Sequence, residues 1–144
     1  GHKVVFPNGV FDLLHKGHVT YLAAAARLGD VLVVGINDDA SVRRLGKGED
    51  RPIVPEADRA AVVAALRSVT AVVLFGSDTP LTMIQALHPD VLVKGGDYDA
   101  ECTDASHPRY IVGSTEVRSQ GGTVATIDLV PGRSTTAIAS KLKG

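Results

Sequence analysis

The sequence predicts an α/β protein in which a parallel sheet is covered by helices on both faces. Short apolar runs typical of buried strands alternate with longer helical patterns along the chain. One run, 31–36, has no polar side chain at all, as expected of a strand buried on both faces. Strands that alternate with helices in this way indicate parallel pairing through helical crossovers.

The expected strands are apolar, β-rich runs that end at turn-forming residues. The first ends at Pro7-Asn8-Gly9, and the fourth ends at Lys94-Gly95-Gly96-Asp97. In chain order, strands are expected over 3–6, 31–36, 71–75, 91–93 and 123–127.

The expected helices are recognised by their ends. The first helix is alanine-rich and stops at Gly29. Two later helices begin at Pro55 and at Thr79-Pro80, and Ser134 caps the last helix. Segment 98–108 is polar and irregular, which indicates a surface loop. In chain order, helices are expected over 17–28, 40–45, 55–66, 80–88, 109–120 and 134–142.

Right-handed crossovers leave few arrangements of such a sheet, and a Rossmann-like, doubly wound order of 3-2-1-4-5 is expected. One domain over 3–144 would contain it, with Gly1 and His2 as the remnant of a tag. In this order the winding reverses between strands 1 and 4, and ligands bind beyond the carboxyl ends of the strands at that point. The segments after strands 1, 4 and 5 are therefore the expected site.

Two histidines follow the first strand. His15 and His18 flank Gly17 at the beginning of a helix, where unpaired amides and the helix dipole favour an anion. Imidazole donors there suit attack of a phosphate oxygen on the α-phosphorus of a nucleoside triphosphate, because an anionic nucleophile needs no general base. The alternatives are capping or surface histidines, or a zinc site, for which the other histidines and Cys102 lack the spacing.

The segments after strands 4 and 5 are also unusual. Lys94 to Tyr98 (KGGDY) combines a cation, a carboxylate and glycines that permit close backbone approach, and a plain turn is the alternative. Ser134, Thr135 and Thr136 offer three hydroxyls at a helix beginning, which suits the β- and γ-phosphates. Ordinary helix capping is the alternative there.

The His-x-Gly-His segment at 15–18 and the Ser-Thr-Thr run at 134–136 resemble the two signatures of the cytidylyltransferase-like nucleotidyltransferase superfamily. The resemblance implies that His15 and His18 stabilise the transition state and that Asp12 lies in the cleft as a substrate contact, a turn cap being the alternative. Arg133 stands where the family has isoleucine, which leaves its role open. The implied nucleotide contacts are Asn8, Gly9, Phe11, His15, Gly17, His18, Lys94, Gly95, Asp97, Ser134, Thr135 and Thr136.

The whole chain looks like the adenylyltransferase unit of bacterial ADP-heptose synthesis. The likeness covers 6–15, 37–41, 91–98 and 133–136. It implies transfer of the adenylyl group of ATP to D-glycero-β-D-manno-heptose 1-phosphate, which gives pyrophosphate and ADP-heptose, a lipopolysaccharide precursor. That unit occurs alone or fused to a sugar kinase. This chain departs from it at Val10, where the family usually has cysteine, and in a longer stretch near 102–107.

Two more basic residues and a metal follow from the resemblance. Relatives use a lysine after strand 2 on phosphates, so Lys47 is expected as a catalytic and substrate-binding residue, with a solvated basic loop as the alternative. Arg59 resembles a helix arginine that faces the site, with a surface ion pair as the alternative. Mg²⁺ is expected to arrive with ATP, bound to phosphates and water.

Composition narrows the function further. The formal net charge of -1 gives no field that would attract nucleic acid, and no long apolar run or signal peptide points to a membrane. The single cysteine fits a reducing cytoplasm, and a homo-oligomer is compatible with the sequence. Two other functions stay open, namely a cytidylyltransferase acting on glycerol or ethanolamine phosphate and a non-catalytic nucleotide-binding module.

Overall fold

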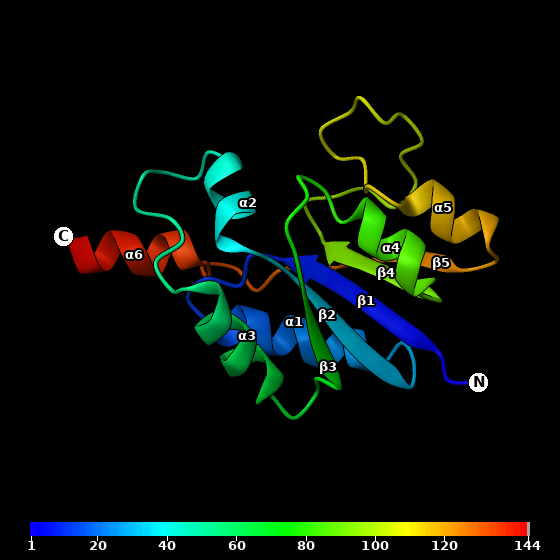
Figure 1. Ribbon diagram of the computed structural model, residues 1–144, viewed down its shortest axis with the longest axis horizontal. Coiled ribbons are helices and arrows are strands. Elements are labelled where there is room, and N and C mark those ends of the chain that lie inside the picture. The colour runs from blue at the N-terminus through cyan, green and yellow to red at the C-terminus, as the bar shows by residue number, and fades with distance from the viewer. Residues whose placement is uncertain (144) are drawn as a thin grey trace.

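Five strands form one parallel sheet in the computed structural model, which describes residues 1–143 (Figure 1). Their order across the sheet is β3-β2-β1-β4-β5, and every neighbouring pair is parallel. The predicted Rossmann-like order is confirmed. The strands are β1 (Val4–Gly9), β2 (Val31–Asn37), β3 (Ala71–Phe75), β4 (Val91–Gly95) and β5 (Thr123–Ile127).

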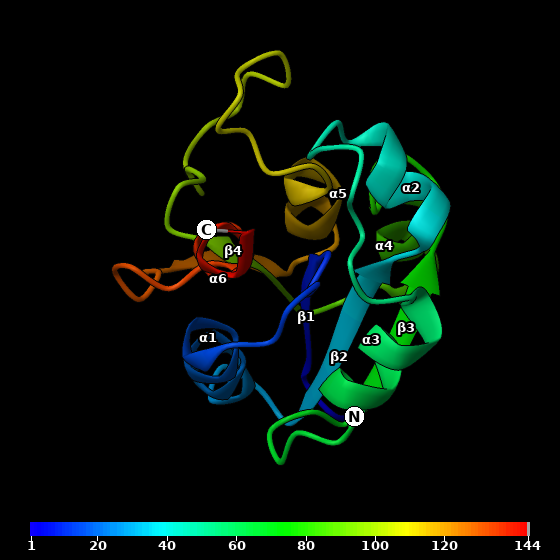
Figure 2. The ribbon, with the colours of Figure 1, turned by 90° about the vertical axis from the view of Figure 1, so that its left-hand side faces the viewer.

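Helices cover both faces of this sheet, because alternate side chains of each strand point to opposite sides. On one face Val5 of β1 belongs to a core cluster with α1 and α3, and on the other Phe6 packs with α4 and α5. Figure 2 shows α1 and α5 on opposite sides of β1. The helices are α1 (Lys16–Ala26), α2 (Asp39–Arg44), α3 (Glu56–Ala64), α4 (Leu81–Leu87), α5 (Ser114–Ser119) and α6 (Thr135–Lys143).

Two strands are longer than the sequence predicts. The ladder between β1 and β2 pairs Val5 with Leu32 and resumes at Asn8 beyond Pro7, so β1 continues to Gly9. A single proline removes only one N–H from the ladder, and the neighbouring residues keep the strand paired. β4 likewise continues through Lys94 to Gly95. Residues 7–9 and 94–95, which were expected to form turns, therefore belong to the sheet, whereas Gly96 and Asp97 form the predicted turn after β4.

The helix predictions are wrong mainly at one place. Segment 109–113 was expected to be helical, but α5 begins at Ser114 because Gly113 has φ 93°, a left-handed conformation outside the helical region. The cap of α4 is Pro80 rather than Thr79, and α1 ends at Ala26, two residues early. The predicted cap of α6 is confirmed, since the Ser134 hydroxyl oxygen accepts a hydrogen bond from the Ala137 N–H.

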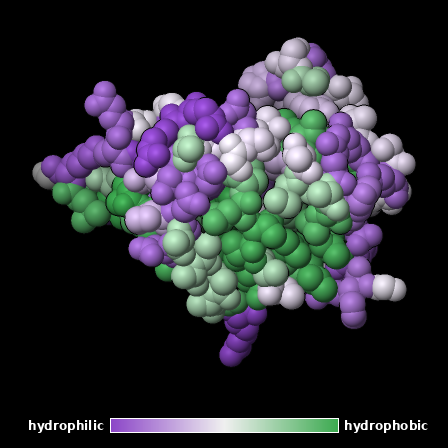
Figure 3. Space-filling model, in the orientation of Figure 1, coloured by the Kyte–Doolittle hydropathy of each residue, from purple (hydrophilic) through white to green (hydrophobic). Residues whose placement is uncertain are grey.

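One face of the molecule has a concentration of apolar side chains. Figure 3 shows apolar side chains gathered over β3, at the edge of the sheet, and over the adjoining helices. Within residues 1–143, no helix has the length and apolar character needed to cross a membrane. The chemically unusual residues of the sequence lie elsewhere, beyond the carboxyl ends of the central strands.

Candidate active site

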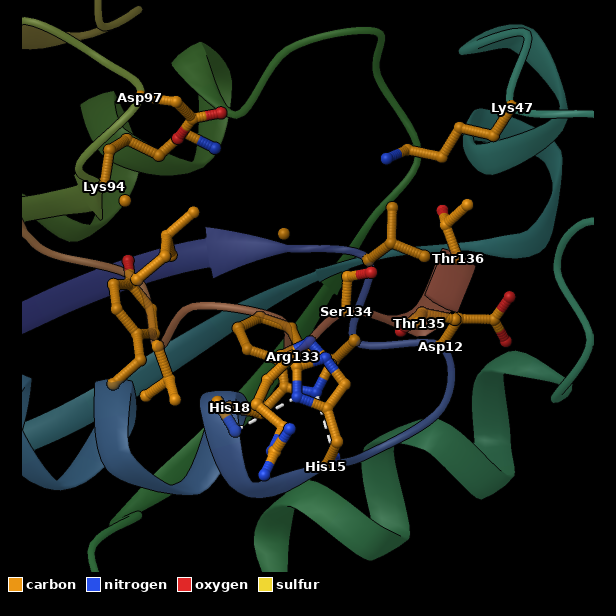
Figure 4. Close-up of a pocket in the computed structure, with 18 of the residues that line it drawn as sticks. Asp12, His15, His18, Lys47, Lys94, Asp97, Arg133, Ser134, Thr135 and Thr136 are labelled. Carbon is orange, nitrogen blue, oxygen red and sulfur yellow. Dashed lines mark hydrogen bonds between the residues drawn. The ribbon is translucent and has the colours of Figure 1, made fainter. Parts of the chain in front are cut away.

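A cavity of about 350 Å³ opens beyond the carboxyl ends of β1 and β4, at the predicted reversal of winding. Figure 4 shows the residues that surround it, with the histidines on one side and the two lysines across from them. Arg59 is the one predicted site residue that does not line this cavity. The predicted residues that do line it are Asn8, Gly9, Phe11, Asp12, His15, Gly17, His18, Lys47, Lys94, Gly95, Asp97, Ser134, Thr135 and Thr136.

The two imidazoles cap α1 and stack on each other. Nδ1 of His15 accepts a hydrogen bond from the N–H of Gly17 at 3.0 Å, and Nδ1 of His18 accepts one from the N–H of His15 at 3.3 Å. Their ring centroids lie 3.8 Å apart. A ring nitrogen that accepts a hydrogen bond has no proton, so each neutral ring keeps its proton on Nε2. Both rings therefore have an Nε2–H donor left for a ligand.

Burial keeps these rings uncharged at neutral pH. The pKa of His18 falls to about 4, first because burial disfavours the imidazolium ion and second because His15 is adjacent. Burial, followed by the charge of Arg133, also lowers the pKa of His15. The pair can thus donate hydrogen bonds to phosphate oxygens without being protonated first.

The loop before α1 is shaped by Phe11 and Gly17. Phe11 has φ 52°, a left-handed conformation that is uncommon for a bulky residue, and its buried ring lies 5.2 Å from that of His18. A Cβ at position 17 would lie 2.8 Å from Cε1 of His15, closer than such atoms approach. Glycine at this position therefore leaves room for the His15 ring.

The hydroxyl run at the beginning of α6 meets the histidine loop directly. The Thr135 hydroxyl donates to the carbonyl oxygen of Leu13 at 3.1 Å and accepts from its N–H at 3.4 Å. The Ser134 hydroxyl accepts the capping bond from Ala137 and so keeps its own proton for another acceptor. Segments from the two ends of the described chain are thus joined at one wall of the cavity.

Lys94 is a buried cation at the end of β4. Its Nζ donates to the carbonyl oxygen of Asn8 at 3.3 Å and lies 4.9 Å from the centre of the Tyr98 ring. Burial lowers the pKa of Lys94 to about 8, Asp97 opposes the change, and the charge of Lys47 adds to it. A bound anion would stabilise the charged form of Lys94, offsetting both the cost of its burial and the repulsion from Lys47.

The lining of the cavity is cationic as a whole. Two carboxylates, those of Asp12 and Asp97, face a larger set of basic side chains, and Asp12 is already paired with Arg51. Such a surplus in a cleft attracts polyanions. The basic lining residues are Lys47, Arg51, Lys94 and Arg133.

The family model described as Cytidylyltransferase-like matches residues 6–141 of the chain. The chain belongs to this family. It is accordingly a nucleotidyltransferase domain, and the fold and cavity described above are those of a cytidylyltransferase-like protein.

Curated relatives match over nearly the whole chain. The bifunctional protein HldE of Methylobacillus flagellatus is 55% identical over 142 residues, which are 99% of this chain and 27% of the relative. Bifunctional protein HldE of Syntrophotalea carbinolica is 54% identical, with the same coverage of both chains. The chain thus spans about a quarter of the length of these relatives.

Solved structures of the same fold are also similar. The lipopolysaccharide core biosynthesis protein from Thermoplasma volcanium GSS1 is 30% identical with a TM-score of 0.69, covering 90% of this chain and 98% of that one. A protein of unknown function from Archaeoglobus fulgidus has a TM-score of 0.60 at 18% identity, covering 92% and 93%. At that identity the second likeness concerns the fold alone.

Arg59 was expected to face the site of this cytidylyltransferase-like domain, but the structure places it elsewhere. Its side chain is 0% exposed and lies outside the cavity lining. The guanidinium donates to the carbonyl oxygens of Val10, Asn37 and Val54 and to the carboxylate of Asp39. Arg59 therefore ties together the segments behind the cavity, because all of these acceptors belong to the protein.

Several residues of the lining were not predicted, among them Arg51, Tyr21 and Arg133. The side chain of Arg51 is 9% exposed and pairs with Asp12, a contact that no local pattern in the sequence indicates. Tyr21 of α1 lines the cavity while its hydroxyl donates to the carbonyl oxygen of Val93, and its spacing in the sequence is that of an ordinary core aromatic. Arg133 stands beside the hydroxyl run, close enough to His15 to lower its pKa.

The residues present suit a magnesium ion that arrives on phosphates. Among residues 1–143, no three histidine, cysteine or carboxylate side chains gather as a ready set of metal ligands. Both oxygens of Asp12 are engaged, which leaves Asp97 as the carboxylate of the lining without a salt-bridge partner in the described part of the chain. Mg²⁺ commonly keeps several waters and takes phosphate oxygens as its other ligands, which requires few protein carboxylates.

Proposed function

We propose that this domain transfers the adenylyl group of ATP to a sugar 1-phosphate, namely D-glycero-β-D-manno-heptose 1-phosphate, and releases pyrophosphate. One observation supports it above the others. The stacked imidazoles of His15 and His18 and the hydroxyls of 134–136 line one cavity, although more than 110 residues of sequence separate them. A polyphosphate can span both groups at once.

In the proposed reaction an oxygen of the acceptor phosphate forms a bond to the α-phosphorus of ATP. The bond from that phosphorus to the bridging oxygen of the β-phosphate breaks, and pyrophosphate leaves with the electron pair. The nucleophile is already an anion, so no base is needed, and catalysis rests on positioning and on stabilising negative charge. His15 and His18 do this through their Nε2–H donors.

The other lining residues hold the substrates in this proposal. The beginning of α6, with Ser134 and Thr136, binds the β- and γ-phosphates, and Lys47 neutralises charge on the reacting groups. Asn8, Lys94 and Asp97 contact the rest of the nucleotide. Bound Mg²⁺ supplies further neutralisation of the triphosphate oxygens.

The choice of ATP and of heptose as substrates rests on similarity. The matching segments, among them VLVKGGDY at 91–98, are those of the ADP-heptose adenylyltransferase family, and a similar solved structure is described as a lipopolysaccharide core biosynthesis protein. The HldE relatives are bifunctional and much longer than this chain, which fits a sugar kinase as the second activity of the pathway. A cytoplasmic location belongs to the same proposal.

Pyrophosphate release across a panel of substrates tests the proposal. ATP, CTP, GTP and UTP are each combined with heptose 1-phosphate, glycerol phosphate and ethanolamine phosphate in the presence of Mg²⁺. Turnover is expected with ATP and heptose 1-phosphate, and mass spectrometry should identify ADP-heptose as the product. The matched control is His107→Ala, which removes an exposed histidine outside the cavity.

Each other outcome has a definite meaning. Turnover with CTP and glycerol or ethanolamine phosphate would replace the proposed substrates while keeping the chemistry. Binding of ATP without turnover on any acceptor would instead indicate a non-catalytic nucleotide-binding module.

A further inference from the structure

Lys47 belongs to a segment that contains no helix or strand. Residues 45–54, here named the strap, connect α2 to the cap of α3, and residues 45–50 are exposed. Gly46 and Gly48 flank Lys47 with φ of 71° and 128°, so glycine conformations lie on both sides of it. In Figure 4 Lys47 extends from the strap across the cavity toward Lys94 and Asp97. The position of Lys47 therefore depends on what fixes the strap.

One end of the strap is fixed by Asp12. The Asp12 carboxylate accepts hydrogen bonds from Nε of Arg51 at 2.8 Å, from the N–H of Ile53 at 2.9 Å and from the N–H of Val54 at 2.9 Å. The side chain of Asp12 is 1% exposed and that of Arg51 is 9% exposed. A buried carboxylate that accepts three hydrogen bonds from a four-residue stretch holds that stretch firmly.

Asp12 is also part of the wall that contains the histidines. It lies three residues before His15, and the next residue, Leu13, is bonded to Thr135 at the beginning of α6. In Figure 4 its carboxylate points away from the two imidazoles.

A second contact of the strap is an ion pair on the surface. Nζ of Lys143 in α6 lies 2.7 Å from a carboxylate oxygen of Asp50. An ion pair exposed in this way contributes little to stability.

A direct contact between Asp12 and a phosphorylated substrate fits these observations poorly. Both carboxylate oxygens already accept hydrogen bonds from the protein. An unpaired carboxylate would also repel a triphosphate, and here Arg51 offsets its charge. The contacts indicate that Asp12 acts on the strap rather than on the ligand.

We propose that Asp12 and Arg51 are positioning residues for Lys47: their buried pair anchors the strap so that Lys47 is held over the polyphosphate. The anchoring itself is a property of the protein without ligand. The effect on turnover rests on the function proposed above. The two parts therefore have separate tests.

Proteolysis without nucleotide tests the anchoring. Trypsin cleaves after exposed lysine and arginine, and the rates of cleavage after Lys47 and after the exposed Arg67 can be followed by mass spectrometry. In Asp12→Asn, which keeps the shape of the side chain but loses its charge, cleavage after Lys47 should accelerate about 10-fold relative to Arg67, because local opening governs such cleavage. An unchanged ratio of the two rates would refute the anchoring, whether or not the protein is an enzyme.

The rate of cleavage after Arg67 distinguishes loss of the anchor from destabilisation of the whole fold. Loss of one partner of a buried ion pair can unfold a protein, in which case cleavage after Arg67 would rise equally. Arg51→Lys then takes the place of Asp12→Asn, because it keeps the charge while losing the fixed geometry of the guanidinium. Arg43→Lys is the matched control, since Arg43 is exposed in α2 and outside the cavity lining.

A double-mutant cycle tests the effect on catalysis. Arg51→Lys alone should lower kcat by roughly 10-fold, the scale expected when a catalytic group is misplaced. In a Lys47→Ala background the same change should lower kcat less than about 2-fold, because the residue it positions is gone. Losses that multiply would overturn the proposal that the pair acts through Lys47. If no substrate pair reacts at all, the function proposed above fails, and the proteolysis result still decides the anchoring.

Discussion

His18 meets the cavity with one ring nitrogen fixed and the other available. The backbone N–H of His15 occupies Nδ1, so the ring cannot rotate freely, and burial keeps it neutral. A donor that is oriented before the substrate arrives needs no reorganisation when charge develops on the phosphate oxygens. The same reasoning applies to His15, whose Nδ1 accepts from Gly17.

Replacement of His18 by alanine should therefore lower turnover by about 10²-fold or more, as expected for loss of one preorganised donor to a developing oxyanion. Steady-state release of pyrophosphate measures the effect. His107→Ala, outside the cavity, should leave turnover unchanged. Near-normal turnover in His18→Ala would remove this ring from the mechanism.

The lowered pKa of His18 also predicts how stability depends on pH. The pKa is 6.5 in the unfolded chain and about 4 in the folded protein, so between these values the unfolded chain binds more protons. The contribution of His18 to stability is complete above pH 6.5 and decreases as the pH falls toward 4.

Comparison with His18→Gln isolates this contribution from that of the carboxylates. Glutamine can still accept the capping hydrogen bond from His15 but does not titrate. The unfolding midpoint, measured by thermal melting from pH 7 to pH 4, should fall less steeply in His18→Gln than in the unchanged protein. Parallel curves would show that the His18 pKa is not lowered by folding.

Some residues of the cavity could be predicted from the sequence, whereas the contacts of others could not. The histidines and the hydroxyl run, which line one cavity, could be singled out in the sequence because their spacing and their place after strands have a chemical meaning. The roles of Asp12 and Arg59 depend on partners more than 20 residues away, namely Arg51 and Asn37, and no local pattern reports such contacts. A charged side chain near a site looks the same in sequence whether it faces the ligand or the protein.

At the scale of an element, α1 combines a structural end with a functional one. Its first turn is capped by two imidazoles in place of the usual serine or aspartate, and Gly17 gives up helix propensity to leave space for one of them. The beginning of this helix is therefore built for the cavity rather than for maximal stability.

Gly17→Ala should separate the effect of this position on helix stability from its effect on the cavity. Alanine favours a helix over glycine by up to about 1 kcal/mol, whereas disturbing the His15 cap costs about 1 kcal/mol, so the two effects should offset each other and the free energy of unfolding should change by no more than about 1 kcal/mol. The new Cβ would displace the His15 ring, so turnover should fall roughly 10-fold or more. Urea unfolding and a turnover assay measure the two effects. Thr20→Ala, at an exposed position of the same helix, is the control, and equal turnover in both variants would contradict the argument.

Elements were predicted well where periodicity and end signals agree. β5 matches its predicted range, and the cap of α6 lies at Ser134 as expected. The errors arose where a local signal competes with tertiary pairing. Pro7 predicts an end to β1 from the sequence alone, but pairing with β2 and β4 on either side keeps residues 7–9 in the sheet. The helical pattern before Ser114 is overruled by the left-handed Gly113.

At the scale of the whole molecule, strand order was predictable because few right-handed topologies are compatible with alternating strands and helices. Arg59 shows how the layers are held together behind the cavity. Its buried guanidinium donates hydrogen bonds to carbonyl oxygens of the loop after β1, the end of β2 and the strap. It also donates to the carboxylate of Asp39 in α2. No other side chain type has enough donors in this fixed arrangement.

Arg59→Ala should therefore destabilise the protein by more than about 3 kcal/mol, because it leaves buried carbonyl groups and a partly buried carboxylate without partners. The free energy of unfolding in urea measures this loss. Arg67→Ala, which removes an exposed arginine, should change it by less than about 0.5 kcal/mol. Similar values for the two variants would mean that the Arg59 hydrogen bonds are not structural.

The bonds between Thr135 and Leu13 have a consequence for biosynthesis. They join positions 122 residues apart, and the hydroxyl run leaves the ribosome only after all five strands have been translated. A polypeptide that stops short of residue 134 would thus contain every strand and the histidine loop but lack the opposite wall of the cavity. Such a polypeptide would keep the strand framework while missing the residues proposed to bind the β- and γ-phosphates.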